Sequence, residues 1–100
     1  MLARNALIAN GADGIFVYGP SEFLGQQIPG AAGTVILANE ADANADDGVD
    51  VRGAATTIAR NSANRNVDLG IDAVIGVTDV GGNRAAGNGN PLQCVNVVCS

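Results

Sequence analysis

Short runs of alternating apolar and polar residues recur along the chain at a fixed distance. The apolar run TTIA at 56–59 is followed by the polar stretch NSANRN at 61–66 and then by VDLGIDAV at 67–74. The recurring unit reads approximately I-x-x-N-x-A-x-x-N-x-x-x-G-(I/V)-x-V. Apolar residues at alternate positions indicate short β-strands, because successive side chains of a strand point to opposite faces.

Four copies of an N-x-x-x-x-N motif carry this pattern. Three of them begin at Asn39, Asn61 and Asn83, a spacing of 22 residues, whereas the first begins at Asn5, 34 residues before Asn39. The longer first interval indicates an insertion of about 12 residues. We expect a single domain with coils over residues 1–17, 34–55, 56–77 and 78–100 and an inserted loop at 18–33.

A 22-residue period of short strands without a helical segment predicts an all-β fold, in which each repeat is one coil of a parallel β-solenoid and coils stack at about 4.8 Å. Stacked asparagines would form ladders, in which each side-chain amide donates to the side-chain carbonyl of its neighbour and satisfies a buried polar group. Asparagine also tolerates the left-handed backbone of a sharp corner, and the alanine between the two asparagines suits a tight corner. The expected ladder residues are Asn5, Asn10, Asn39, Asn44, Asn61, Asn66, Asn83 and Asn88.

The N-x-A-x-x-N corners, the G-(I/V)-x-V strands and the closing segment GVTDVGGNRAAGNGNPLQCVNVVC resemble the right-handed parallel β-helix repeat proteins of the pectin-lyase-like superfold. The resemblance covers about residues 34–100 well and 1–17 tolerably, and it implies a right-handed coil but says little about function. Leu92 stands where the last coil should have a glycine, and NGNP at 88–91 should deform that coil. Because Met1 falls within a coil, we expect the chain to be the C-terminal portion of a longer solenoid.

The composition limits which residues can form the core and which partners the chain can bind. Aromatic residues make up only 3% of the chain, so the core has to be built from isoleucine, valine, leucine and alanine. A net charge of −5 would repel a phosphate backbone, which argues against nucleic acid as a partner. No run reaches the about 18 apolar residues that span a membrane. Asn5 and Asn10 interrupt any apolar core of a secretion signal, so a signal peptide, if the protein has one, lies outside this chain.

Cys94 and Cys99 lie close together in the segment CVNVVC. The chain has no histidine and only these two thiols, so it cannot close a zinc site alone. A local disulfide is the expected state and would indicate an extracellular or cell-surface protein. Two free thiols, or a metal or intermolecular role, stay open. A covalent link in the terminal coil would limit fraying and cover an open edge.

Aspartates recur in register and form one candidate site. The stacked pairs are Asp46 with Asp68, Asp50 with Asp72, and Asp13 with Asp47. Like charges about 5 Å apart repel unless something offsets them. Calcium held by Asp46, Asp50, Asp68 and Asp72 could offset this repulsion, and no other cofactor is expected. The alternative is a solvated acidic face that water and salt screen.

The inserted loop is the second candidate site, because long loops at one corner of a solenoid often carry binding residues. Tyr18, Glu22, Phe23 and Gln26 are the residues that we expect to bind a ligand there. The alternative is a surface loop that merely tolerates insertion.

Three classes of function fit these residues. We expect a non-catalytic repeat protein that serves as a structural element or as a carbohydrate-binding surface of a secreted protein. The resemblance implies an alternative, the C-terminal part of a polysaccharide lyase or glycoside hydrolase, in which paired aspartates or an arginine with calcium-bound acids act on the glycan; no family catalytic motif is present. In the third class, the exposed first coil docks onto another β-helix coil.

Overall fold

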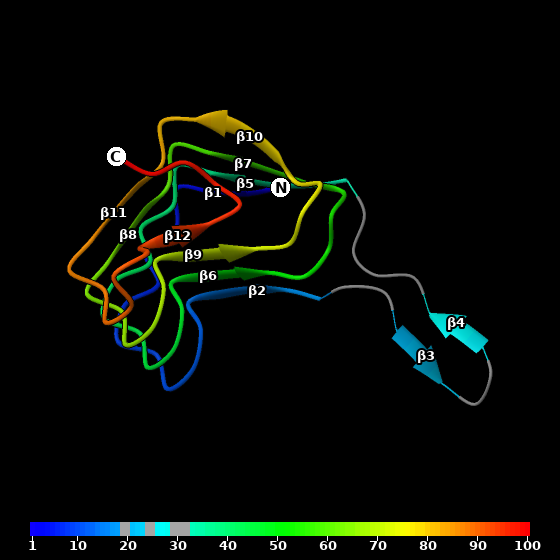
Figure 1. Cartoon of the computed structure of the whole chain (residues 1–100), viewed down its shortest axis with the longest axis horizontal. Coiled ribbons are helices and arrows are strands. Elements are labelled where there is room, and N and C mark those ends of the chain that lie inside the picture. The colour runs from blue at the N-terminus through cyan, green and yellow to red at the C-terminus, as the bar shows by residue number, and fades with distance from the viewer. Residues whose placement is uncertain (19–20, 24–25, 29–32) are drawn as a thin grey trace.

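The computed structural model describes residues 1–18, 21–23, 26–28 and 33–100 (Figure 1). In this part of the chain the structure consists of strands and turns and contains no helix. The strands are β1 (Leu2–Ala3), β2 (Ile15–Val17), β3 (Ser21–Phe23), β4 (Gln26–Ile28), β5 (Thr34–Leu37), β6 (Val49–Val51), β7 (Thr56–Ala59), β8 (Ser62–Asn64), β9 (Ile71–Ala73), β10 (Thr78–Gly81), β11 (Arg84–Ala86) and β12 (Cys94–Val95). Their short length follows from the frequent glycines and asparagines between apolar runs.

Each repeat contributes one strand to each of two long parallel sheets, in chain order. One sheet has the order β1-β5-β7-β10 and the other β2-β6-β9-β12 (Figure 1). A smaller sheet pairs β8 with β11, and isolated bridges at Ala6, Glu40 and Ser62 extend it toward the first repeats. The expectation of an all-β chain with parallel strands is confirmed.

The core contains the apolar residues that alternate along the strands. Ile36 lies beside Ile58, and Val49 lies beside Ile71, so residues 22 positions apart are neighbours. All four side chains are fully buried. Ala63, between two asparagines, is also fully buried. A run of small aliphatic layers therefore replaces the aromatic core that the composition lacks.

Left-handed backbone occurs at the residue before each ladder asparagine, and not at the asparagine as the sequence suggested. Ala43, before Asn44, has φ 57°, and Arg60, before Asn61, has φ 56°. The left-handed residues of this kind are Arg4, Ala9, Ala38, Ala43, Arg60, Arg65, Gly82 and Gly87. Each turns the chain so that the N–H and the side chain of the following asparagine both reach the next repeat.

The last repeat departs from the expected register twice. The pairing of β10 with β7 shifts between Asp79 and Gly81, so Val80 bulges outward, 64% exposed, and does not lie over Ile58. Cys94 pairs with Ile71, so Gln93 and not Leu92 lies in the column of the repeated glycine. The two departures are separate: Val80 is an additional residue relative to β7, and one more residue between Asn88 and Gln93 shifts the later pairing.

The inserted segment 18–33 contains more than a loop. Strands β3 and β4 pair antiparallel, with Ser21 beside Ile28 and Phe23 beside Gln26. Antiparallel pairing over so few residues identifies a short hairpin between β2 and β5. In the described residues, no helix is both long and apolar enough to cross a membrane.

Candidate functional site

Two ladders of asparagine run along the stack from the first repeat to the last. In the first ladder, Asn5, Asn39 and Asn61 each donate Nδ2–H to the Oδ1 of the next asparagine, at 3.0, 3.1 and 3.2 Å, ending at Asn83. The backbone N–H of each asparagine donates to the same oxygen, as Asn39 does toward Asn61 at 2.9 Å. The ladder therefore uses both donors of one residue on one acceptor of the next.

The second ladder repeats this arrangement five residues later in each repeat. Asn10, Asn44 and Asn66 donate to the next asparagine at 2.8, 3.0 and 3.0 Å, ending at Asn88. The remaining amide hydrogen of Asn66 bonds to the carbonyl of Ala41 at 2.9 Å. Because the ladder satisfies these buried amides, they stabilise the corners and avoid a desolvation penalty.

The recurring glycine makes room for the second ladder. A Cβ on Gly48 would lie 2.7 Å from Nδ2 of Asn66, and one on Gly70 would lie 2.9 Å from Nδ2 of Asn88. No real Cβ approaches an atom so closely. The glycine of the G-(I/V)-x-V motif is therefore required by the close approach of an asparagine side chain.

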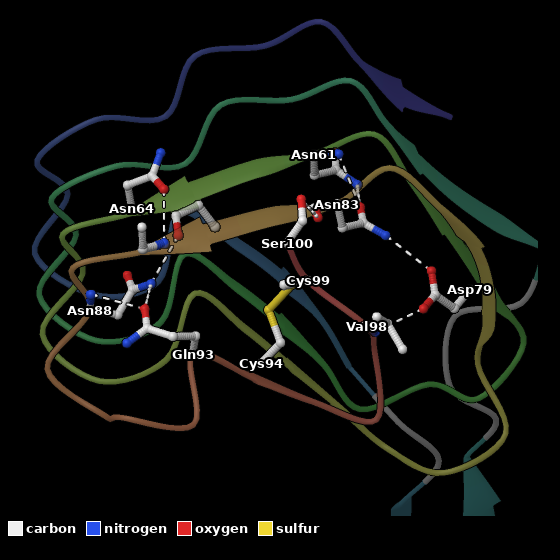
Figure 2. The surroundings of a disulfide bond; sticks show 12 residues. Asn61, Asn64, Asp79, Asn83, Asn88, Gln93, Cys94, Val98, Cys99 and Ser100 are labelled. Carbon is white, nitrogen blue, oxygen red and sulfur yellow. Dashed lines mark hydrogen bonds between the residues drawn. A yellow bond between two sulfur atoms is a disulfide. The ribbon is translucent and has the colours of Figure 1, made fainter.

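Both ladders end on side-chain acceptors in the last repeat. Asp79 Oδ1 accepts from Asn83 Nδ2 at 3.1 Å, and Gln93 Oε1 accepts from Asn88 Nδ2 at 2.8 Å (Figure 2). Asp79 and Gln93 are the two residues that the shifted register brings to this end. Gln93 Oε1 also accepts the N–H of Asn88 at 3.1 Å, as a further asparagine would, whereas Asp79 accepts only the side-chain amide of Asn83.

The expected disulfide between Cys94 and Cys99 is present (Figure 2). It links the two arms of the terminal segment, in which Val97 is buried against the core. Ser100 N–H donates to the carbonyl of Asn83 at 3.0 Å, and Val98 N–H donates to Asp79 Oδ2 at 2.8 Å. The bond therefore fixes the segment that covers the last repeat.

Asp50 on β6 and Asp72 on β9 are neighbours in register, as predicted. Arg52 lies between the two carboxylates, with Nε 2.6 Å from Asp50 Oδ1 and Nη2 2.7 Å from Asp72 Oδ2. The contact to Asp50 Oδ1 is an ion pair without hydrogen-bond alignment, and this buried oxygen has no hydrogen-bond donor among the described residues. The guanidinium thus supplies the positive charge that the stacked acids need.

Burial and this ion pair act in opposite directions on the acids. Burial raises the pKa of Asp50, and the charge of Arg52 offsets only part of that rise. For Arg52, burial would lower the pKa, but the two carboxylates outweigh it and raise the pKa of the guanidinium. Arg52 therefore stays charged, and Asp50 holds its charge less readily than an exposed aspartate.

Among the described acids, Asp47 has the pKa that is shifted most. Its carboxylate, 3% exposed, accepts the N–H of Leu69 at 2.8 Å, while Asp13 Oδ1 accepts the N–H of Asp47 at 3.0 Å. Burial raises the pKa of Asp47 to about 6, and the nearby charges of Asp46, Asp72 and Asp50 add to the rise. The pairing of Asp13 with Asp47 thus serves to bind backbone N–H groups of successive repeats.

Asp42 has a similar structural role that the sequence did not suggest. It is buried and accepts the N–H of Asn64 at 2.9 Å, and its other oxygen lies 3.0 Å from Nη2 of Arg65. The equivalent position in the next repeat is Asn64, so a side-chain oxygen recurs there, and this recurrence was the signal in the sequence. An acceptor at this corner bonds the following repeat.

The residues of the predicted calcium site are brought together in part. Carboxylate oxygens of Asp47, Asp50 and Asp72 lie within 4.8 Å of one another, and those of Asp13, Asp46 and Asp47 form a second group of the same size. Asp68 belongs to neither group, and its Oδ1 accepts from Asn90 Nδ2 at 3.1 Å. Carboxylate oxygens fit calcium in kind, but Arg52 and the backbone already occupy several of them. Calcium binding stays a prediction.

The predicted loop site is described only at its first residue. Tyr18 is 56% exposed, whereas the side chains of Glu22, Phe23 and Gln26 lie outside the described residues. The sequence missed Phe16, also 56% exposed, which lies beside Asp50 in the register of β2 and β6. Phe16 stands at the variable position x of the G-(I/V)-x-V motif, where two other repeats have aspartate. An aromatic residue in place of an aspartate was the signal in the sequence for an exposed ring at this position.

No family model, no curated protein and no solved structure matches the chain. The described part of the surface holds no pocket. Among the described residues, the exposed features with distinct chemistry are Asn5 and Asn10 at the first end of the ladders and the outward face of β2, β6 and β9.

Proposed function

We propose that the chain is a right-handed parallel β-helix that serves as a non-catalytic binding module of a secreted protein, with a polysaccharide as its ligand. For the fold, the support is that every repeat supplies one strand to each long parallel sheet in chain order. Right-handed crossovers are the strong default for parallel strands. The Cys94–Cys99 disulfide supports an oxidising, extracellular location.

One observation carries the proposed ligand class. Phe16 on β2 and Tyr18, which directly follows β2, are both 56% exposed, and side-chain alternation along the extended chain places them on the same outward side. In the next repeats that face carries Asp50, Arg52 and Asp72. Aromatic rings offer a flat apolar surface to a sugar ring, and carboxylates with a guanidinium bond its hydroxyl groups. An extended chain of sugars can contact several repeats at once.

Affinity electrophoresis of the full chain through gels that contain xylan, dextran or polygalacturonate tests the proposal. We expect retardation by at least one neutral polymer, and about a tenfold weaker affinity for Phe16→Ala and for Tyr18→Ala. Ile75→Ala is the matched control, because Ile75 is 84% exposed and lies outside this face. Equal migration of wild type and both aromatic variants in every gel would contradict the proposal.

A second candidate is the hydrolase or lyase alternative, which the pKa of Asp47 favours. An acid with a pKa of about 6 can hold a proton near neutral pH, and a carboxylate oxygen of Asp72 lies within 4.8 Å of it. Retaining glycoside hydrolases use two carboxyl groups about 5 Å apart. Release of reducing or unsaturated ends by wild type, and its loss in Asp47→Asn, would support catalysis. Binding without turnover would support the module.

A further inference from the structure

Arg52 presents hydrogen-bond donors to solvent on the same face as the exposed aromatic residues. Its side chain is 44% exposed, and its Nε and Nη2 lie 2.6 Å from Asp50 Oδ1 and 2.7 Å from Asp72 Oδ2. A guanidinium carries five N–H groups in one plane, so its remaining donors have no acceptor among the described residues. Because two carboxylates hold the plane, these remaining donors keep one orientation.

Asp72 supplies an acceptor next to these donors. Its side chain is 19% exposed, its Oδ2 contacts Arg52, and no group among the described residues donates to its Oδ1. Asp50 differs, because its side chain is only 11% exposed and its Oδ1 is buried. Asp50 therefore orients Arg52, whereas Asp72 and Arg52 can both contact a ligand.

This donor and this acceptor fit two neighbouring hydroxyl groups of a sugar ring. One hydroxyl accepts from the guanidinium and the other donates to the carboxylate, because a hydroxyl group can do either. Phe16 lies beside Asp50, and Asp50 lies beside Asp72, so the aromatic ring and the polar pair belong to one column across β2, β6 and β9 (Figure 1). Neighbouring strands are about 4.8 Å apart, a distance that one sugar unit of an extended chain can span. A polysaccharide that runs along the stack therefore contacts both.

The charge of this surface acts against acidic sugars. Arg52 offsets only one of the two carboxylates that it contacts. A carboxylate oxygen of Asp47 also lies within 4.8 Å of an oxygen of Asp50 and of Asp72. A uronate or sulfate group at Asp72 would lie beside a like charge, whereas a neutral hydroxyl would not. Such a juxtaposition of like charges discriminates between ligands.

We propose that Arg52 and Asp72 form a specificity subsite for neighbouring hydroxyl groups of a neutral polysaccharide, and that the surplus carboxylate beside them excludes uronates and sulfated sugars. The inference rests on the proposed polysaccharide-binding function and adds which polymers the face accepts. Asp50 is a positioning residue, because it acts through Arg52. Phe16 and Tyr18 supply contact area that does not depend on the charge of the sugar.

Galacturonan provides a matched pair of polymers, because methyl esterification removes its carboxylate charge and keeps its ring hydroxyl groups. In affinity electrophoresis at about 0.15 M salt, we expect the full chain to bind the methyl ester about tenfold more tightly than polygalacturonate. Acetylation of the ester's hydroxyl groups should weaken binding about tenfold, since an acetylated hydroxyl cannot donate to Asp72. Equal or tighter binding of polygalacturonate, or equal binding of the acetylated ester, would overturn this inference and leave the proposed function in place. If no polymer retards the chain, the proposed function fails and this inference fails with it.

Asp72→Asn tests the subsite itself. The amide keeps the size of the side chain and removes its charge, so the preference for the methyl ester should fall to about twofold or less. Glu40→Gln is the matched control, because it changes the net charge equally but lies exposed beside Ser62, at the smaller sheet, and should keep the full preference. Far-UV circular dichroism checks that both variants retain their strands. An equal loss of preference in both variants would show that the net charge of −5, and not the subsite, excludes acidic polymers, and would overturn the proposal.

Discussion

Replacing Asn61 by alanine is the most direct test of the ladders. Asn61 Oδ1 accepts two donors of Asn39, at 2.9 and 3.1 Å, and its Nδ2 donates to the carbonyl of Ile36 at 3.0 Å and to Asn83 Oδ1 at 3.2 Å. Alanine removes all four bonds. Asn83 Oδ1 keeps the backbone donor of residue 61, but both donors of Asn39 lose their acceptor inside the fold.

The expected loss follows from these unpaired groups. A buried polar group without a partner costs about 1–3 kcal/mol. With two orphaned donors on Asn39 and a small void that admits little water, we expect Asn61→Ala to lower the free energy of unfolding by about 3 kcal/mol. Urea denaturation followed by far-UV circular dichroism measures it, and an unchanged m-value would show that both proteins unfold in the same way.

Asn5→Ala is the matched control, because Asn5 belongs to the same ladder but is exposed. It removes one side-chain bond to Asn39 Oδ1, while the backbone N–H of residue 5 still donates to that oxygen at 2.9 Å. Water replaces the lost donor, so we expect less than about 1 kcal/mol. If Asn61→Ala costs no more than Asn5→Ala, burial of the ladder does not stabilise the fold.

Three further changes test other parts of the stack. Burial favours the protonated form of Asp47, so the folded protein loses stability as pH rises from the ordinary pKa of 3.8 through about 6. In urea titrations, Asp47→Asn should therefore leave the free energy of unfolding nearly unchanged at pH 4 and raise it by up to about 3 kcal/mol at pH 8. Ala43→Gly should raise stability by up to about 1 kcal/mol in the same assay, because φ 57° strains a side chain; a loss would contradict this reading. Gly48→Ala should cost about 3 kcal/mol and lower the melting temperature, since its Cβ would meet Nδ2 of Asn66 at 2.7 Å; an unchanged melting temperature would refute the steric argument.

The sequence was most informative where residues recur. Because Asn39, Asn61 and Asn83 are spaced by the length of one repeat, their spacing fixed which residues lie beside one another, and Ile36 beside Ile58 followed from it. A single strand pattern could not have given the register, since a shift of one residue turns every side chain to the other face. The repeat therefore predicted the parallel strands and the buried ladders.

Features that occur once were beyond the pattern. Arg52 has no equivalent in the neighbouring repeats, so its position between two aspartates depended on the register of β6 and β9 and on a side-chain rotamer. Asp79 and Gln93 reach the ladders only because the last repeat contains additional residues. The left-handed positions were misassigned by one residue, since both alanine and arginine occupy them and neither favours that backbone.

The strained alanines and arginines have a consequence for how stability is distributed. A left-handed non-glycine residue costs about 1 kcal/mol, and each such residue is followed by an asparagine whose two donors need the next repeat. A repeat alone would bear the strain without the ladder bonds, so it gains stability only when a neighbour is present. In the last repeat both corner positions are glycine, Gly82 and Gly87, which adopt this backbone without a side-chain clash. The exchange of alanine or arginine for glycine thus coincides with the repeat whose ladders end on Asp79 and Gln93. Strain, ladder and end acceptors are therefore parts of one arrangement, in which the interfaces between repeats supply the stability of each repeat.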